Sequence, residues 1–517
     1  MAANLGKAEC PRRSQTAASR AGALQHRHLN HHPRQRERLL HMTSELLVVN
    51  AWMMLPFGLL LAAIALAPFF FSSWWGKHYA KVAFGLAGVV VLYYLWGLHA
   101  SGNVWRTAQD YISFIALIGS LFVVSGGIHI NVKGEATPHV NVIFLLVGAV
   151  IANLLGTTGA SMLLIRPWLR MNKYRLTGHH VVFFIFIVSN VGGCLTPIGD
   201  PPLFLGYLMG VPFTWVMSRC LPMWAVGVGL LLAMFYVVDR RNFARAPREV
   251  RSELTAHHEQ WRFEGLLNLV FLGVILGAVF VHHPSFLREG LMVAAALGSY
   301  FTTTKSVHES NHFNLHPIRE VAVLFVGIFG TMMPALDWLQ MNAARLDLAS
   351  PGFFYWGSGC LSSVLDNAPT YLCFLKATFG RFLTPDAIAQ LTQLVQTHGA
   401  GLATLTGTHA DEIKQAFAAL QQYHPGDLAG GCVTADQIQV AYLLGNLKFN
   451  SFITAVSVGA VFFGANTYIG NGPNFMVKAI ADQQHAHSPT FLGYILKYSL
   501  PYMLPMLLVV WWLFFKR

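Results

Sequence analysis

Charged residues are scarce in this sequence. Asp, Glu, Lys and Arg make up 11% of its 517 residues, whereas hydrophobic residues make up 54%. A soluble domain carries about 25% charged residues, so this composition excludes a water-soluble globular protein. Many separate apolar runs approach the ~20 residues that a helix needs to span a bilayer. We therefore predict an all-α polytopic membrane protein whose main partner is the lipid bilayer.

Other signatures are also missing. The six cysteines show no metal-ligand spacing, and we interpret those in apolar runs as small hydrophobic residues. We find no nucleotide-binding loop, so any active transport would draw on an ion gradient. Much of the net charge of +12 lies in residues 1–44 and 239–263, which fit a disordered basic tail and a basic loop better than a nucleic-acid surface. We predict no cofactor and no nucleic-acid partner.

One motif occurs twice. Its first copy, Thr196–Phe204, reads TPIGDPPLF, and its second copy, Thr467–Phe475, reads TYIGNGPNF. Aligned on the threonines, the copies share Thr, Ile, Gly, Pro and Phe, and Asp200 corresponds to Asn471. Each copy interrupts an apolar run with Pro and Gly, which do not continue a helix. Paired breaks in the two halves of a membrane protein point to a transporter's binding site.

A polar segment precedes each copy of the motif. The segments are 153–161, which reads NLLGTTGAS, and 362–370, which reads SSVLDNAPT. If their apolar runs cross the membrane fully, the halves are parallel repeats of six spans. If each run dips in and returns as a re-entrant hairpin, each half has five spans and the halves are inverted. We favour hairpins, because Gly156–Gly159 and Asp366–Pro369 are poor centres for a helix.

The predicted organisation follows from these patterns. It has two inverted repeats of about five transmembrane helices, each with a re-entrant hairpin and a broken helix. A polar stretch with helical patterning interrupts the second repeat and indicates a soluble helical insertion. The positive-inside bias makes the basic connector cytoplasmic. The predicted segments are the tail 1–44, the first repeat 45–238, the connector 239–263, the second repeat 264–379 and 441–517, and the insertion 380–440.

Two acidic residues, Asp200 and Asp366, lie in segments that we place within the membrane. Charged side chains there are rare and are functional by default; the alternative is that each carboxylate caps a half-helix. As functional groups they would bind Na⁺ or H⁺. Neighbouring amide and hydroxyl oxygens suit a hard cation, whereas half-helix N-termini suit an anion. The predicted ion- or substrate-binding residues are Asn153, Thr157, Thr158, Asn190, Thr196, Asp200, Asp366, Asn367, Thr370, Asn466, Thr467 and Asn471.

These motifs resemble the ion transporter superfamily. The resemblance is carried by Ser189–Pro202, Leu365–Thr370 and Gly464–Asn474, and it extends over about residues 45–515 outside the insertion. The most similar branch contains citrate transporters and NhaD-like sodium:proton antiporters. The resemblance implies inverted repeats, two hairpins, two broken helices, a homodimer and an elevator-like movement of the hairpin-bearing domain.

The hairpin tips distinguish between substrates. The dicarboxylate branch of the superfamily carries Ser-Asn-Thr at both tips, whereas this chain has Gly156-Thr157-Thr158 at one tip and Asn367–Thr370 at the other. We therefore expect a secondary active transporter, not an enzyme, that exchanges Na⁺ for H⁺ in a bacterial inner membrane. The alternative is a cation-coupled carrier of citrate or another organic anion. A redox protein that ligates haem through membrane histidines is a remote alternative.

Overall fold

The computed structural model describes residues 47–133, 136–245, 260–281, 284–345, 350–484, 486 and 488–516. The whole predicted tail, residues 1–44, lies outside the described residues, as do residues 246–259 of the predicted connector. The chain divides into a larger unit, Val49–Arg381 with Ser451–Arg517, and a smaller unit that includes Phe382–Asn450.

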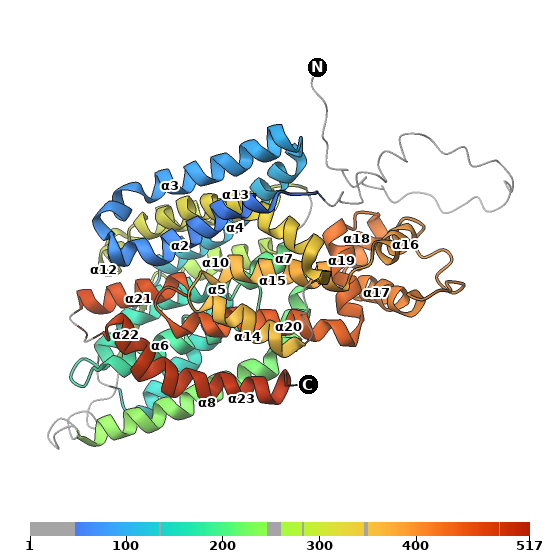
Figure 1. Cartoon of the computed structure of the whole chain (residues 1–517). Coiled ribbons are helices and arrows are strands. Elements are labelled where there is room, and N and C mark those ends of the chain that lie inside the picture. The colour runs from blue at the N-terminus through green and yellow to red at the C-terminus, as the bar shows by residue number, and fades with distance from the viewer. Residues whose placement is uncertain are drawn as a thin grey trace, which may run out of the picture. The chain divides into compact units, whose positions relative to one another are not determined.

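Both units are built from helices (Figure 1). In the described residues, the strands are β1 (His129–Lys133) and β2 (Gln260–Glu264), which form an antiparallel ribbon. Nine helical segments of the described chain are long and apolar enough to cross a membrane. These findings confirm the predicted all-α polytopic membrane protein. The nine segments are Ala51–Pro68, Ser73–Gly97, Ser101–Gly126, Pro138–Met171, Gly178–Leu195, Phe213–Arg245, His316–Arg345, Leu447–Asn466 and Phe491–Phe514.

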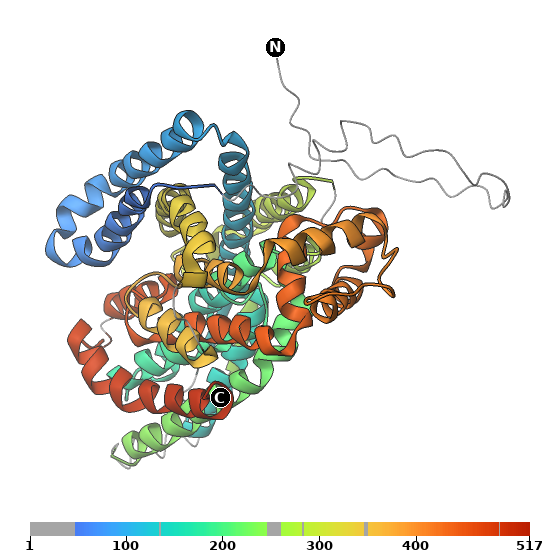
Figure 2. The same ribbon diagram turned by 45° about the vertical axis from the view of Figure 1, so that its right-hand side comes forward.

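A first group of helices in the larger unit packs around α13. Helix α13 contacts α2, α3 and α4, and α11 contacts α4 and α10; Figure 2 shows α2 and α3 in blue beside the yellow α13. Small residues allow this close packing, since a Cβ on Gly327 of α13 would lie 2.8 Å from the Cβ of Ala83 on α3. The group comprises α2 (Leu55–Phe70), α3 (Ser72–Leu92), α4 (Ser101–Gly126), α10 (Asn268–Ala278), α11 (Leu287–Thr302) and α13 (His316–Asn342).

Helix α5 (Pro138–Met171) is a hairpin rather than a single crossing. It turns at Gly156, whose φ of 73° and ψ of 156° are not helical. Its ends meet, because the Ala136 N–H donates to the Met171 carbonyl over 3.0 Å. Beside them, Asn141 Nδ2 donates to Asn172 Oδ1 over 2.8 Å. The segment is therefore two helical arms joined by a turn, as the hairpin prediction requires.

A second hairpin is formed by α14 (Pro351–Ser362) and α15 (Asn367–Phe382). The rings of Phe354 and Phe374, one on each arm, lie 5.9 Å apart. The turn between the arms is the polar segment that the sequence analysis singled out. Both predicted hairpins are thus present as helix–turn–helix elements.

Both copies of the doubled motif break a helix. In the first half the order is α6 (Gly178–Ile187), η3 (Val191–Leu195) and α7 (Pro201–Leu208). In the second half it is α20 (Leu447–Phe463), η5 (Gly464–Asn466) and α21 (Gly472–Gln483). Proline occupies the first position of α7 and the second position of α21, where its missing N–H costs no intrahelical bond.

A further helix follows each broken helix, and short segments complete the larger unit. The first following helix is α8 (Phe213–Arg245); the second is formed by α22 (Phe491–Tyr494), the π-helix η6 (Ile495–Met503) and α23 (Leu504–Phe514). The short segments are η1 (Ala51–Met54), the π-helix η2 (Tyr93–Gly97), α12 (Lys305–Ser310) and η4 (Ala343–Arg345).

The smaller unit covers most of the stretch predicted as an insertion. It contains α16 (Pro385–Gln396), α17 (Ala410–Tyr423), α18 (Pro425–Gly430) and α19 (Ala435–Gly445). Helices α17 and α19 pack together, and the Tyr442 hydroxyl donates to Glu412 between them. Partial burial favours a higher pKa for Glu412, but hydrogen bonds from Tyr442 and His409 outweigh it and lower the pKa.

Candidate ion-binding site

Each hairpin tip is fixed to its helix break by the same hydrogen bond. In the first half, Thr196 Oγ1 donates to the Asn153 carbonyl over 2.7 Å. In the second half, Thr467 Oγ1 donates to the Ser363 carbonyl over 2.6 Å. Each threonine hydroxyl also accepts the backbone N–H three residues further on, over 3.1 Å in both halves. Thr196 and Thr467, which occupy the same position in the two motif copies, therefore stabilise equivalent turns in the two halves.

The residues four positions after Asn153, Ser363 and Thr467 all donate hydrogen bonds to the carboxylate of Asp200, which itself lies four positions after Thr196. Thr157 Oγ1 donates to Asp200 Oδ1 over 2.7 Å, and Asn471 Nδ2 donates to the same oxygen over 3.1 Å. Asn367 Nδ2 donates to Asp200 Oδ2 over 2.6 Å. All four side chains are at most 2% exposed. We call Asp200, Thr157, Asn367 and Asn471 the carboxylate cluster; both hairpins and both breaks contribute to it.

The two predicted acidic residues have different surroundings. Asp200 precedes α7, but its carboxylate makes no capping bond and instead accepts the three bonds of the cluster. Asp366 is half-buried, and its Oδ1 accepts the Ala368 N–H over 3.0 Å at the start of α15. The Thr370 hydroxyl donates to the Asp366 carbonyl over 3.0 Å, a bond within its own helix. Asp366 and Thr370 thus lie outside the hydrogen bonds of the cluster.

A second layer of asparagines supports the cluster. Asn471 Nδ2 also donates to Asn190 Oδ1 over 3.1 Å, and Asn190 Nδ2 donates to Asn474 Oδ1 over 2.7 Å. Asn474 Nδ2 donates to the carbonyls of Gly464 and Thr467 over 2.8 and 2.9 Å. Asn474 of the second motif copy aligns with Leu203 of the first, so the two halves differ at this position.

The remaining predicted residues hold the tips or line the space beside them. Asn153 Nδ2 donates to the Gly192 carbonyl over 2.7 Å, and its Oδ1 accepts the Leu195 N–H over 2.9 Å. Asn466 Nδ2 donates to Ser363 Oγ over 2.9 Å. Thr158 is half-buried and faces a cavity next to the carboxylate.

This cavity adjoins Asp200 and the first hairpin tip. Its volume is about 20 Å³, and Gly156, Thr157, Thr158 and Asp200 contribute to its lining. A water molecule needs about 10–15 Å³ of such space. The cavity therefore has room for a water-sized particle beside Asp200. Apolar side chains of α4 line the cavity from the first helix group; they are Leu117, Ile118 and Leu121.

Backbone donors near the carboxylate are few. Pro201 and Pro202 open α7, so its first two positions have no N–H to offer an anion. At the first hairpin tip, the Thr157 N–H donates to the Gly199 carbonyl over 2.7 Å. At the second tip, the Ala368 N–H is bonded to the capping carboxylate. The N-terminal N–H groups that usually bind anions are thus missing or already bonded at these positions.

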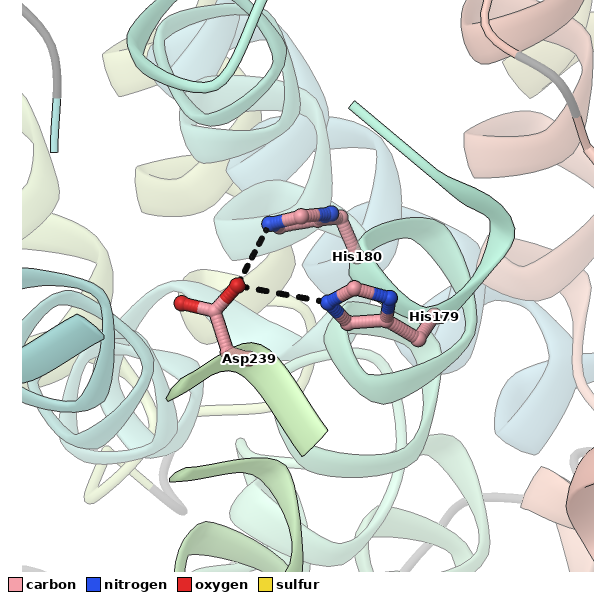
Figure 3. A group of neighbouring side chains, drawn as sticks. All are labelled: His179, His180 and Asp239. Atoms are coloured by element: carbon pink, nitrogen blue, oxygen red, sulfur yellow. Dashed lines mark hydrogen bonds and ion pairs between the residues drawn. The ribbon is translucent and has the colours of Figure 1, made fainter. Parts of the chain in front are cut away.

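A separate group of ionisable side chains is buried near the base of the first hairpin (Figure 3). Asp239 of α8 is fully buried, and Arg175 Nη2 donates to its Oδ2 over 3.0 Å. The Nε2 atoms of His179 and His180 lie 3.3 and 3.1 Å from Asp239 Oδ1. Helix α8 continues to Arg245, so Asp239 is a helical residue although it stands at the predicted start of the connector.

The three side chains drawn in Figure 3 offer the atom types of a metal site. Two contacts argue against that use. The Thr177 N–H donates to His180 Nδ1 over 3.3 Å, which leaves the ring hydrogen on Nε2, the atom that a metal would need. Arg175 already neutralises Asp239, so a divalent cation would add uncompensated buried charge. We interpret the group as an ionic tie between α6, α8 and the hairpin base.

Two hairpins and two broken helices that enclose a buried carboxylate define a multi-pass membrane transporter rather than an enzyme. A family model described as "Putative citrate transport" matches residues 46–515, and the chain belongs to this family. No curated protein matches the chain. The family agrees with the citrate-transporter part of the branch that the motifs resemble.

Proposed function

We propose that this protein is a secondary active transporter that exchanges Na⁺ for H⁺ at Asp200. The observation that carries the proposal is the carboxylate cluster, in which one buried acidic group is surrounded by hydroxyl and amide side chains from both halves. Both amides donate N–H groups to Asp200 in this structure, so a cation would require them to rotate and present their oxygens, which suit a hard cation. No Lys or Arg side chain is among the hydrogen-bond partners of Asp200 in the described residues.

A buried oxygen without a donor supports a cation at this position. Asn367 is fully buried, and its Oδ1 has no hydrogen-bond partner among the described residues. A buried acceptor left without a donor costs roughly 1–3 kcal/mol. A cation or a proton shared with Asp200 would satisfy this oxygen after a rotation of the amide. Asp200 and Asn367 would then act together as ligands, with Thr157 and Asn471 beside them.

Exchange follows from the competition of two cations for one carboxylate. An uncompensated carboxylate is costly to bury, so the loaded site carries either Na⁺ or H⁺. Each ion would neutralise Asp200, and binding of one would displace the other. The inverted relation of the two halves belongs to this proposal, because a re-entrant hairpin in each half would leave an odd number of spans per half.

The second candidate function is cation-coupled transport of citrate. The family description supports it directly. Pro201 and Pro202 leave the first two positions of α7 without an N–H group, which counts against a carboxylate substrate at this helix start. Under this alternative the carboxylate cluster would hold the coupling cation.

Orientation and assembly complete the proposal. Basic residues gather at the base of the first hairpin and at the end of α8, so this end would face the cytoplasm of a bacterial inner membrane. A homodimer is expected from the family resemblance. The basic residues of this end are Arg170, Lys173, Arg175, Arg240, Arg241 and Arg245.

The decisive experiment compares both substrates in the same vesicles. Everted membrane vesicles of an antiporter-deficient host are loaded with an acidic interior, and a fluorescent pH probe follows the response to added NaCl. We expect Na⁺ to cause alkalinisation of the interior, while labelled citrate accumulates no faster than in control vesicles. Citrate uptake that depends on Na⁺ or H⁺, without Na⁺-driven alkalinisation, would instead establish the second candidate.

A further inference from the structure

The last membrane helix departs from regular α-helical geometry beside the second break. Residues Ile495–Met503 form a π-helix that contains Pro501. Wide turns of this type occur often at functional sites because they redirect side chains. No residue of this segment belongs to the predicted site.

Two hydroxyl groups of this helix donate to the unwound turn. Ser499 Oγ donates to the Asn466 carbonyl over 2.7 Å, and Tyr494 Oη donates to the Ala465 carbonyl over 2.8 Å. Ser499 is 4% exposed and Tyr494 is fully buried. Both acceptors belong to η5, where the first half of the broken helix ends and its last carbonyls lack intrahelical donors.

The Ala465 and Asn466 carbonyls, which accept these bonds, are adjacent in sequence to side chains that donate hydrogen bonds to the tip of the second hairpin. Asn466 Nδ2 donates to Ser363 Oγ at the hairpin tip. The following residue, Thr467, donates to the Ser363 carbonyl. Asn471, at the end of the same turn, donates to Asp200. A shift of the η5 backbone would therefore displace the tip and one donor of the carboxylate cluster together.

The first half uses a comparable contact from a different residue. Trp224 of α8, the helix that follows the first break, donates its Nε1–H to the Gly192 carbonyl over 2.8 Å. Gly192 lies in η3, the counterpart of η5. In each half, the helix after the break thus supplies a donor to a carbonyl of the unwound turn.

We propose that Tyr494 and Ser499 are positioning residues for cation binding. They hold the Ala465 and Asn466 carbonyls, and through this turn they set the distance between Asn471 and Asp200. Neither hydroxyl takes part in the carboxylate cluster, so they act through the backbone. The inference rests on the proposed function, because it assigns the consequence to Na⁺ affinity.

Conservative variants of the purified full-length protein test this role. Ser499→Ala and Tyr494→Phe each remove one hydroxyl, and Ser499→Thr restores it. The matched control is Tyr498→Phe, a half-buried tyrosine of the same π-helix whose hydroxyl has no hydrogen bond to η5. The readouts are the KM for Na⁺ in proteoliposomes and amide hydrogen exchange of residues 464–471.

We expect Ser499→Ala and Tyr494→Phe to raise the KM for Na⁺ about five- to tenfold, the effect of one lost hydrogen bond. Hydrogen exchange in residues 464–471 should become faster, while kcat and the Tm change little. Ser499→Thr and Tyr498→Phe should behave like the wild type. An unchanged KM together with unchanged hydrogen exchange in both variants overturns the inference. A wild type without Na⁺ exchange overturns the proposed function alone, because hydrogen exchange still tests the positioning role.

Discussion

Replacement of Asp200 by asparagine is the most direct test of the carboxylate cluster. The substitution removes the charge and keeps the shape of the side chain. Two unit charges 4 Å apart attract each other by about 4 kcal/mol at an effective dielectric constant of about 20. Since 1.4 kcal/mol corresponds to a factor of ten, Asp200→Asn should weaken Na⁺ binding by about a thousandfold.

The structure indicates that the Asp200→Asn protein still folds. The new Oδ1 can accept the bonds from Thr157 and Asn471. The new Nδ2 faces Asn367, whose amide can rotate and offer the Oδ1 that has no donor in the wild type. The number of satisfied buried groups is then maintained, and we expect a Tm close to that of the wild type. A loss of exchange would therefore report on the site rather than on misfolding.

The assay measures Na⁺-driven alkalinisation over a range of NaCl concentrations in vesicles that contain equal amounts of folded protein. We expect no saturable response from Asp200→Asn at concentrations that saturate the wild type. A folded Asp200→Asn protein whose KM for Na⁺ stays within tenfold of the wild type would refute the reasoning, because the carboxylate would then contribute little to cation binding.

Three further predictions concern other parts of the chain. Asp366→Asn retains a good capping residue, so the KM for Na⁺ should stay within about threefold of the wild type; a loss as large as that of Asp200→Asn would make Asp366 a ligand. Gly156→Ala places a side chain on a residue with φ 73° and ψ 156°, 3.3 Å from the Ile198 carbonyl, which should cost about 1–3 kcal/mol and lower the Tm; an unchanged Tm would contradict the strained turn. The pKa of Glu412 is lowered in the folded unit, so its ionised form stabilises the packing of α17 and α19. This stabilisation is fully present above the unfolded pKa of about 4.3. It is lost as the pH falls through the lower pKa of the folded state. Tyr442→Phe should speed amide exchange in these helices at neutral pH and reduce its pH dependence, and identical profiles would count against this interaction.

The sequence determined the class of the fold because the relevant signals are local. Apolar runs of membrane-spanning length, together with few charges, require a helical membrane protein whatever its tertiary arrangement. Pro and Gly in the doubled motif specify where the two helices break, and the glycine-containing segment around Gly156 specifies the first hairpin turn. The side chains of the carboxylate cluster come from the same segments.

Only the tertiary structure decided which of those residues meet. Asp200 and Asp366 look alike in sequence, yet one lies at the centre of a cluster and the other caps a helix. The difference depends on Asn367, which reaches Asp200 across 167 residues of chain, and no local pattern encodes such a contact. The buried ion pair between Asp239 and Arg175 could not be predicted from the sequence either. A charged residue at the end of an apolar run has the same sequence pattern as an exposed loop residue, and only tertiary packing buries it.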